Sequence, residues 1–231
     1  MFIQRESKKK REARVREIMA RLDAHYGDHP MIFLEAENAW QLLFATILSA
    51  QCTDARVNMV TEKLFKKYKS LEDFASCDLQ ELEEDIHSTG FYHNKAKNIK
   101  ACAAALVEEH GGEVPKDIDT LTALPGVGRK TGNLILGNIF DIPSIVVDTH
   151  VKRISNRLGL ADSSDPTKTE FQLMEVLPEE FWIRWNTHII ALGRTLCTSQ
   201  KPKCELCYLN DLCPSVKGDP ETWRAPSERK R

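Results

Sequence analysis

Apolar residues recur every three or four positions through most of this sequence, and that spacing is the period of an α-helix. The pattern is clearest in four runs, at positions 15–22, 40–48, 99–107 and 182–192. Glycine and proline separate the runs, so each is about 10 to 17 residues long, the ordinary length of a globular helix. Only residues 145–147, Ile-Val-Val, resemble a strand, and we expect them to form an extended connector. The sequence therefore predicts an all-α fold.

Length and composition place the chain among ordinary globular proteins. Its 231 residues are 42% hydrophobic and 29% charged, which excludes collagen-like, low-complexity and globally disordered chains. No segment approaches the ~18 uninterrupted apolar residues of a membrane span, and the first residues run into charged ones without a secretory core. The basic N-terminus is short and partly acidic, unlike a targeting peptide, so we expect a cytoplasmic protein.

Net charge gives no overall signal for nucleic acid, because 32 Lys and Arg stand against 34 Asp and Glu. The charges are nevertheless unevenly distributed. Bases outnumber acids within 1–16, 90–100, 148–160 and 194–203, whereas residues 78–85 contain five acids and no base. Folding could gather the basic segments into one phosphate-binding face, or each could be a separate solvated helix face.

Four cysteines within residues 197–213, spaced C-x6-C-x2-C-x5-C, are the strongest chemical signal. They are Cys197, Cys204, Cys207 and Cys213. Without a secretory signal, close-spaced thiols favour metal ligation over disulfides. Four thiolates suit Zn²⁺ or an iron–sulfur cluster, and the wide outer gaps favour the cluster while leaving zinc open. Because all four thiols are used as ligands, we expect a structural centre that holds Lys201 and Lys203 toward a phosphate backbone.

Residues 124–128, Leu-Pro-Gly-Val-Gly, lie between two apolar helical patterns and predict a helix, a tight hairpin and a second helix. Gly126 and Gly128 allow a left-handed backbone and close approach, so N–H groups at the start of the second helix can converge on an anion. Main-chain donors of this kind anchor a nucleic-acid backbone without reading bases. The alternative is a turn that binds nothing.

Lys130 lies on the first turn of the second helix, where a cation opposes the helix dipole. Either it meets phosphate, or partial burial lowers its pKa and makes a neutral amine available as a nucleophile. Asp148 occupies the position of an N-cap, and the same carboxylate could accept a proton or stabilise positive charge on a sugar. His150 either packs against the protein or faces phosphate.

Taken together, these segments resemble the endonuclease III family of DNA glycosylases, within the helix-hairpin-helix Gly/Pro-Asp superfamily. The matching segments are LLFATILSAQCTD at 42–54, TGFYHNKAKNI at 89–99, LPGVGRKTGN at 124–133, VDTHVKRISNRLGL at 147–160 and the four-cysteine loop. The likeness covers roughly residues 15 to 215. Each segment alone is weak, whereas the ordered combination is specific.

The resemblance implies two helical domains with a DNA-binding cleft between them. One is a six-helix domain with the helix-hairpin-helix motif at 32–142. The other is an iron–sulfur cluster domain made of residues 1–31 and 143–216, followed by a flexible tail at 217–231. The resemblance also implies a [4Fe-4S] cluster on the four cysteines, which selects between the two metal centres that spacing left open.

The implied activity is that of a bifunctional DNA glycosylase and abasic-site lyase in base excision repair, removing oxidised or ring-damaged pyrimidines. By position, Lys130 matches the family's nucleophile. That amine displaces the damaged base and forms a Schiff base with the sugar, and β-elimination then cuts the strand. Asp148 matches the essential carboxylate. The extruded base leaves a space that Gln51 fills, beside Phe91 as an apolar wedge. The expected DNA contacts are Gln51, Phe91, Leu124, Gly126, Gly128, Arg129, His150, Lys201 and Lys203.

The expected partner is double-stranded DNA containing a damaged base or an abasic site, bound by a monomer in the cytoplasm and associated with the nucleoid. Two alternatives stay open. A monofunctional mismatch glycosylase of the same superfamily would use water as the nucleophile, and the presence of Lys130 argues against it. A non-catalytic DNA-binding or redox-sensing iron–sulfur protein would use the hairpin and the cluster alone.

Two positions depart from the family pattern. Phe91 is bulkier than the aliphatic residue expected at the wedge. Gly132 stands where alanine is usual, and we expect it to loosen its helix by roughly 0.5 to 1 kcal/mol without removing any chemistry.

Overall fold

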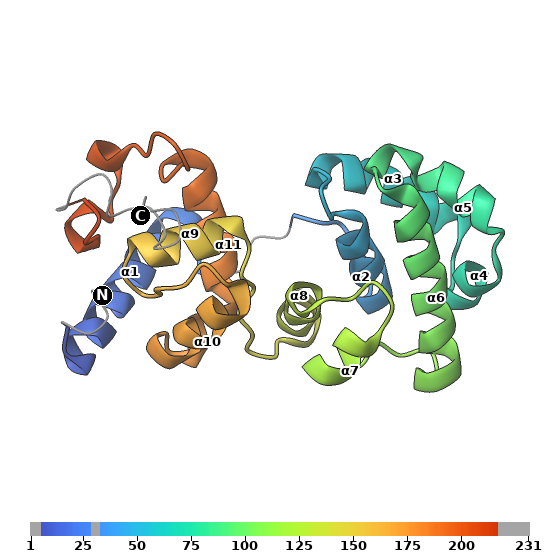
Figure 1. Ribbon diagram of the computed structural model, residues 1–231, viewed down its shortest axis with the longest axis horizontal. Coiled ribbons are helices and arrows are strands. Elements are labelled where there is room, and N and C mark those ends of the chain that lie inside the picture. Colours follow the sequence, from blue (N-terminus) through green and yellow to red (C-terminus); the bar gives the residue numbers. More distant parts are fainter. Residues whose placement is uncertain (1–5, 29–32, 217–231) are drawn as a thin grey trace. The chain divides into compact units, whose positions relative to one another are not determined.

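The computed structural model describes residues 6–28 and 33–216, and the chain forms two compact units (Figure 1). One unit comprises Met1–Met31 and Pro143–Arg231, and the other comprises Ile32–Ile142. All regular elements in the described ranges are helical, which confirms the all-α prediction. The expected flexible tail at 217–231 and the expected boundary at residue 31 lie outside the described residues.

The first unit is built from four α-helices within the part of the chain that the structure describes. They are α1 (Lys8–Tyr26), α9 (Thr149–Arg157), α10 (Pro166–Val176) and α11 (Trp182–Thr195). Short 3-10 turns, Glu179–Phe181, Cys204–Leu206 and Asn210–Leu212, complete it. Its core is centred on Trp185, which is fully buried and whose indole N–H donates to Ser155 Oγ over 3.2 Å. Residues 145–147 form the buried, extended connector that the sequence predicts.

The second unit contains seven α-helical segments and one 3-10 turn, all within residues 33–142. They are α2 (Ala39–Leu48), α3 (Asp54–Lys67), α4 (Leu71–Ser76), α5 (Leu79–Ile86), η1 (His87–Thr89), α6 (Tyr92–His110), α7 (Ile118–Ala123) and α8 (Arg129–Phe140). The described part of the unit thus has seven α-helical segments where six were expected, and α4 and α7 are the shortest of them, with six residues each. Phe44 and Phe74 meet edge to face in the core, with ring centroids 5.0 Å apart.

Most helices begin where a short polar side chain accepts a hydrogen bond from the first turn. Such N-caps are Ser7, Asn38, Thr53, Ser70, Asp78, Asp117, Asp148 and Asp165. Helix α8 is different, because its N-cap is Gly128, which has no side chain to offer. The N–H groups of its first turn therefore lack a side-chain cap.

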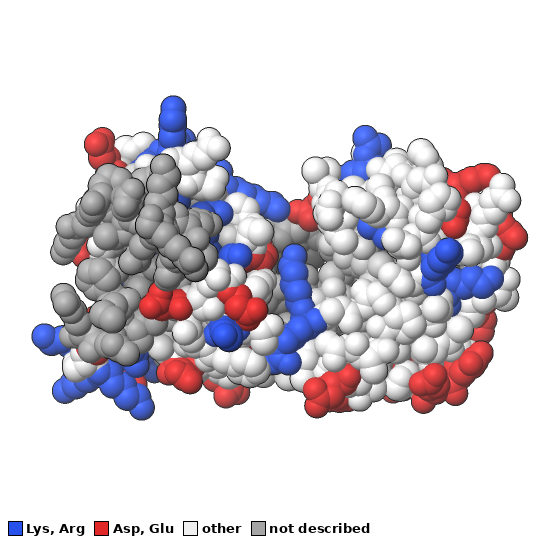
Figure 2. Space-filling view, in the orientation of Figure 1, with Lys and Arg blue, Asp and Glu red and all other residues white. Residues whose placement is uncertain are grey.

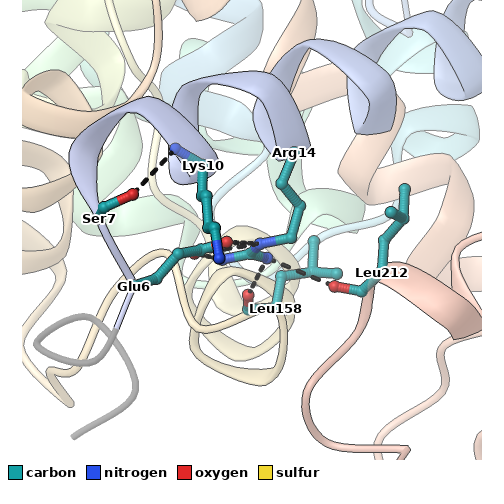
Figure 3. Close-up of polar contacts among 6 residues, drawn as sticks. All are labelled: Glu6, Ser7, Lys10, Arg14, Leu158 and Leu212. Carbon is teal, nitrogen blue, oxygen red and sulfur yellow. Dashed lines mark hydrogen bonds and ion pairs between the residues drawn. The ribbon is translucent and has the colours of Figure 1, made fainter.

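Arg14 fastens the N-terminal helix to the rest of the first unit (Figure 3). Its guanidinium is held by both carboxylate oxygens of Glu6 and donates to the carbonyl oxygens of Leu158 at 2.8 Å and Leu212 at 3.4 Å. Arg21, two turns further along α1, donates to the carbonyl oxygen of Tyr208 at 2.8 Å. Two arginines of α1 thus hold the segment that contains Cys207 and Cys213.

Charged side chains are unevenly placed on the surface (Figure 2). Lys and Arg gather over the N-terminal end of α1, where Lys8, Lys9 and Lys10 are exposed, and Asp and Glu gather near α4 and α5. None of the helices in the described ranges is long and apolar enough to cross a membrane.

Gly126 tests the hairpin's dependence on glycine. A Cβ there would lie 2.7 Å from Asn98 Cβ, and the backbone has φ +77°, so both space and conformation oppose alanine. We expect Gly126→Ala to lower the free energy of unfolding by about 1 to 3 kcal/mol, measured by urea denaturation. Gly128→Ala is the matched control, because a Cβ there meets nothing within 4 Å and its φ of −94° suits any residue. Equal stability losses for both variants would contradict this account.

Candidate functional site

The hairpin between α7 and α8 is formed as the sequence predicts, with one correction. Gly126 has the left-handed backbone, and Val127 N–H closes the turn by donating to the Leu124 carbonyl over 3.1 Å. Gly128 was also expected to use positive φ, but it is extended, with φ −94°. Nothing in the protein occupies the place of its missing Cβ. The small residue at 128 therefore leaves open space in front of the first turn of α8.

Leu124, expected to contact DNA, instead shapes the turn. Its side chain is only 4% exposed and packs in the core, and its N–H donates to the Leu121 carbonyl while its own carbonyl accepts from Val127. Gly132 also has a packing role that the sequence did not indicate. A Cβ there would lie 2.6 Å from Ile118 Cδ1, so the glycine lets α7 pack closely against α8 rather than merely loosening the helix.

Lys130 is the second residue of α8, and its side chain is exposed. Arg129 precedes it on the same turn and is half-buried. The uncapped N–H groups and the positive helix end therefore lie beside a primary amine and a guanidinium. This arrangement can hold an anion with main-chain donors while it leaves an amine accessible for chemistry.

Asp148 caps α9 as its position predicts. Its Oδ1 accepts from Val151 N–H over 2.7 Å, and the side chain is half-buried. The other carboxylate oxygen has no partner among the described residues. One oxygen is thus used to fix the side chain, and the second is available to a ligand or a proton.

His150 is the second residue of α9 and packs against α11. Gly193 provides the space, because a Cβ at that position would collide with the imidazole ring. Nδ1 lies 3.2 Å from an Nη of Arg153, which also donates to the Cys197 carbonyl over 2.9 Å. Burial lowers the pKa of His150, with the positive charges of Arg153 and Arg194 adding to the effect against the opposing influence of Asp148. Burial and the neighbouring guanidinium groups both favour the uncharged form of the ring.

Gln51 and Phe91 protrude from the second unit on strained backbone. Their φ angles are +55° and +50°, in the left-handed region that residues with a Cβ rarely adopt. Gln51 is exposed, and the Phe91 side chain is 64% exposed despite being apolar. Strain and an exposed aromatic ring both cost stability, so the surrounding structure must impose them.

Lys95 imposes them. This side chain was expected in a basic surface segment, but it is buried, and its Nζ donates over 2.8 Å to the carbonyls of both Leu48 and Thr89. Burial lowers its pKa. Leu48 lies three residues before Gln51 and Thr89 two residues before Phe91. One ammonium group therefore joins the two segments that carry the protruding residues.

The four cysteines of residues 197–213 line one cavity of about 200 Å³ in the first unit. All four are free thiols, and within the described ranges no three His, Cys, Asp or Glu side chains gather closely enough to hold a single metal ion. Four sulfurs around a larger cavity fit a polynuclear cluster better than one Zn²⁺. Burial raises the pKa of the thiols of Cys204 and Cys207, and raises that of Cys213 to about 11.

Arg157 anchors this loop, although its segment was expected to form a basic surface. The residue is 4% exposed, and its guanidinium donates to Cys197 Sγ at 3.2 Å and to the carbonyls of Thr198 at 2.7 Å and Ser199 at 2.8 Å. Its own carbonyl accepts from Ser215 Oγ over 2.7 Å. The helix that begins at Asp148 therefore ends by holding both sides of the cysteine loop.

Lys201 and Lys203 are exposed on that loop, as expected, and Lys97 is exposed on α6. Lys100, in contrast, points inward and donates to the Cys77 carbonyl. The sequence could not show which of these lysines are exposed and which point inward. Burial of an ammonium group depends on which carbonyl oxygens the fold brings to it.

Comparison with known proteins finds matches for both the hairpin-containing region and the cysteine loop. Residues 44–179 match the family model of the HhH-GPD superfamily base excision DNA repair protein, and residues 197–213 match the iron-sulfur binding domain of endonuclease III. An all-helical fold, a glycine hairpin before a basic helix start, and a four-thiol cavity thus define a base excision repair class that carries an iron–sulfur loop.

Individual relatives identify one family within this class. Endonuclease III of Synechocystis sp. is 50% identical over 185 residues, covering 80% of this chain and 84% of the relative. Endonuclease III of Escherichia coli strain K12 is 39% identical, covering 85% of this chain and 93% of the relative. A solved trapped endonuclease III–DNA covalent intermediate is 42% identical with a TM-score of 0.82, covering 89% and 97% of the two chains. The chain belongs to the endonuclease III family, and its cofactor is a [4Fe-4S] cluster.

Arg157 provides a test of the cluster site. We expect Arg157→Met to lower the iron content and the visible absorption of the purified protein by more than half, because the change leaves two carbonyls and one sulfur without their donor. Arg16→Gln is the control, since Arg16 is an exposed side chain that pairs with Glu180 and lies over the Phe181 ring. Full cluster occupancy in the Arg157 variant would show that the guanidinium does not hold the loop.

Proposed function

We propose that this chain is a bifunctional DNA glycosylase and abasic-site lyase of base excision repair, with Lys130 as its nucleophile. The observation that carries the proposal is an exposed primary amine on the uncapped first turn of α8, directly after a glycine hairpin. A primary amine can form a Schiff base with the C1′ aldehyde carbon of an opened deoxyribose. The 42% identical neighbour in a trapped covalent intermediate with DNA supports the same chemistry.

The substrate is double-stranded DNA containing a damaged base or an abasic site. A base inside the duplex is inaccessible, so it must be extruded from the stack, at a cost of a few kcal/mol. Damage that weakens base pairing lowers this cost. Gln51 fills the vacated space and Phe91 wedges into the stack beside it. Their exposure and their left-handed backbone support these roles, because neither feature benefits the folded chain alone.

The DNA backbone is anchored by main-chain and cationic groups on each unit. On the second unit, the N–H groups that follow Gly126 and Gly128 hold a phosphate, and Arg129 neutralises it. On the first unit, the exposed lysines at 201 and 203 contact phosphate from the cluster loop. One side of the His150 ring packs on α11. The other edge of the ring contacts the DNA backbone.

The reaction begins when the Lys130 amine, having given a proton to Asp148, attacks C1′ of the extruded nucleotide. The bond from C1′ to the base breaks, the base leaves with a proton, and the nitrogen forms an imine with the opened sugar. Loss of a C2′ proton then breaks the bond from C3′ to its phosphate oxygen, which cuts the strand. Asp148 accepts a proton from the amine and stabilises positive charge at C1′ through the oxygen that Val151 does not use.

The cluster has a structural role in this proposal. Cys197, Cys204, Cys207 and Cys213 are its ligands. A centre with four protein ligands has no open position for substrate, and it holds the loop that presents the two lysines. Oxidised or ring-damaged pyrimidines are the proposed lesions, and the working form is a monomer associated with the nucleoid.

Borohydride trapping tests the nucleophile. Wild-type protein should form a covalent adduct with abasic duplex DNA, and Lys130→Gln should lose it completely, because reduction needs a protein imine. Asp148→Asn should lower the trapping rate by about 10²-fold or more while DNA binding persists. Adduct formation by the Lys130 variant would contradict the assignment, and absence of an adduct with wild-type protein would favour water as nucleophile.

Gly128→Ala tests phosphate anchoring by the hairpin. The added methyl group meets no protein atom, but it occupies the open space before the first turn of α8. We expect about tenfold weaker binding to duplex DNA with an unreactive abasic analogue, measured by fluorescence anisotropy, at unchanged thermal stability. Unchanged affinity would show that no phosphate approaches Gly128.

A further inference from the structure

A second hollow, of about 230 Å³, lies on the second unit away from the hairpin. Helix α3 forms one wall, and the end of α5 with η1 forms the other. The lining side chains that matter for its chemistry are Arg56, Met59, Lys63, Lys67, Asp85 and Ser88. None of them belongs to the groups assigned above.

The cations of this hollow share one face of α3. Arg56, Lys63 and Lys67 are spaced by seven and four residues, so they follow each other along the helix. All three are exposed. Thr53 caps the helix and begins this face, since its hydroxyl accepts from Arg56 N–H over 3.3 Å.

The charges do not balance within the hollow. Lys67 is already paired, with its Nζ 2.5 Å from Asp85 and 2.8 Å from Glu81, and these contacts raise its pKa. Arg56 and Lys63 make no ion pair among the residues that the structure describes. Two unpaired cations and the Ser88 hydroxyl therefore face the same space. The ligand that suits them is an anion with hydrogen-bond acceptors.

The hollow is tied to the protruding residues. Helix α3 begins three residues after Gln51, and Ser88 precedes Phe91 by three residues. Lys95 links the same two segments by donating to the carbonyls of Leu48 and Thr89. If Gln51 and Phe91 enter a DNA duplex, the anion beside them is a phosphate of its backbone, and this step rests on the function proposed above.

Helix packing indicates to which DNA strand this phosphate belongs. Helix α2, which leads to Gln51, packs against α8 and also against α3. In the proposed function the hairpin at the start of α8 holds the strand of the extruded nucleotide, whereas the hollow is on α3, a different neighbour of α2. Since two backbones flank every groove of a duplex, we propose that Arg56 and Lys63 bind a phosphate of the undamaged strand, opposite the lesion.

Met59 fits this assignment. It is 59% exposed, and it lies between Arg56 and Lys63 on the lining of the hollow. A sugar–phosphate backbone presents an apolar deoxyribose edge beside each charged group, so a thioether between two cations matches its chemistry. Inorganic phosphate alone would leave the methionine without a partner.

The test combines a double variant with neutralised DNA. Arg56→Gln with Lys63→Gln should weaken binding to a duplex carrying an unreactive abasic analogue by about tenfold at low salt, and should reduce the salt slope by about 1 to 2. Methylphosphonates, placed singly along each strand, remove one phosphate charge at a time. One or two positions in the undamaged strand should weaken wild-type binding and have no effect on the double variant.

Lys66→Gln with Lys69→Gln is the matched control, because it removes two exposed charges from the same region outside the hollow. Its salt slope and methylphosphonate profile should follow wild type. The proposal fails if the double variant matches this control, or if the sensitive phosphates lie in the damaged strand. Unchanged DNA binding with lost binding of a polyglutamate peptide would assign the hollow to an acidic protein and overturn the proposal. Failure of wild-type protein to bind the duplex would overturn the proposed function as well.

Discussion

The buried ammonium of Lys95 is the interaction on which the functional surface of the second unit depends. A cation without a carboxylate partner is costly in a protein interior, and its lowered pKa reflects that cost. Two carbonyl oxygens compensate by accepting at 2.8 Å, one at the end of α2 and one in η1. The bonds fix the segments that carry Gln51 and Phe91, and they give those strained residues a rigid base. The strain is thus supported at the two residues that we propose to enter the DNA.

A second charged group organises the first unit in a similar way. Helix α9 is capped by Asp148 and ends at Arg157, so a helix of nine residues runs from the proposed proton acceptor to the anchor of the cysteine loop. Arg14 and Arg21 of α1 hold the same loop from its other side. Loss of the cluster would therefore disturb the end of α9 as well as the lysines at 201 and 203.

Three glycines show how differently one residue type can be used near a hairpin. Gly126 is required by its positive φ and by Asn98, whereas Gly132 is required by close packing of α7 on α8. Gly128 satisfies neither condition, and the protein itself gives no reason for it. In the proposed function, the open space at Gly128 admits a DNA phosphate to the start of α8.

The sequence by itself determined the all-helical class, the positions of the main helices, the hairpin and the N-cap at Asp148, because these depend on local periodicity, turn chemistry and capping. It also determined the family, through five motifs in a fixed order. Only the tertiary structure decided which basic residues face inward. Lys95 and Arg157 stand in segments that look like solvated helix faces, yet both are buried against carbonyls from distant parts of the chain. The hollow on α3 was equally invisible, because it needs Asp85 and Ser88 to complete it. Local patterns specify helices, whereas the partner of a charge is chosen by packing between them.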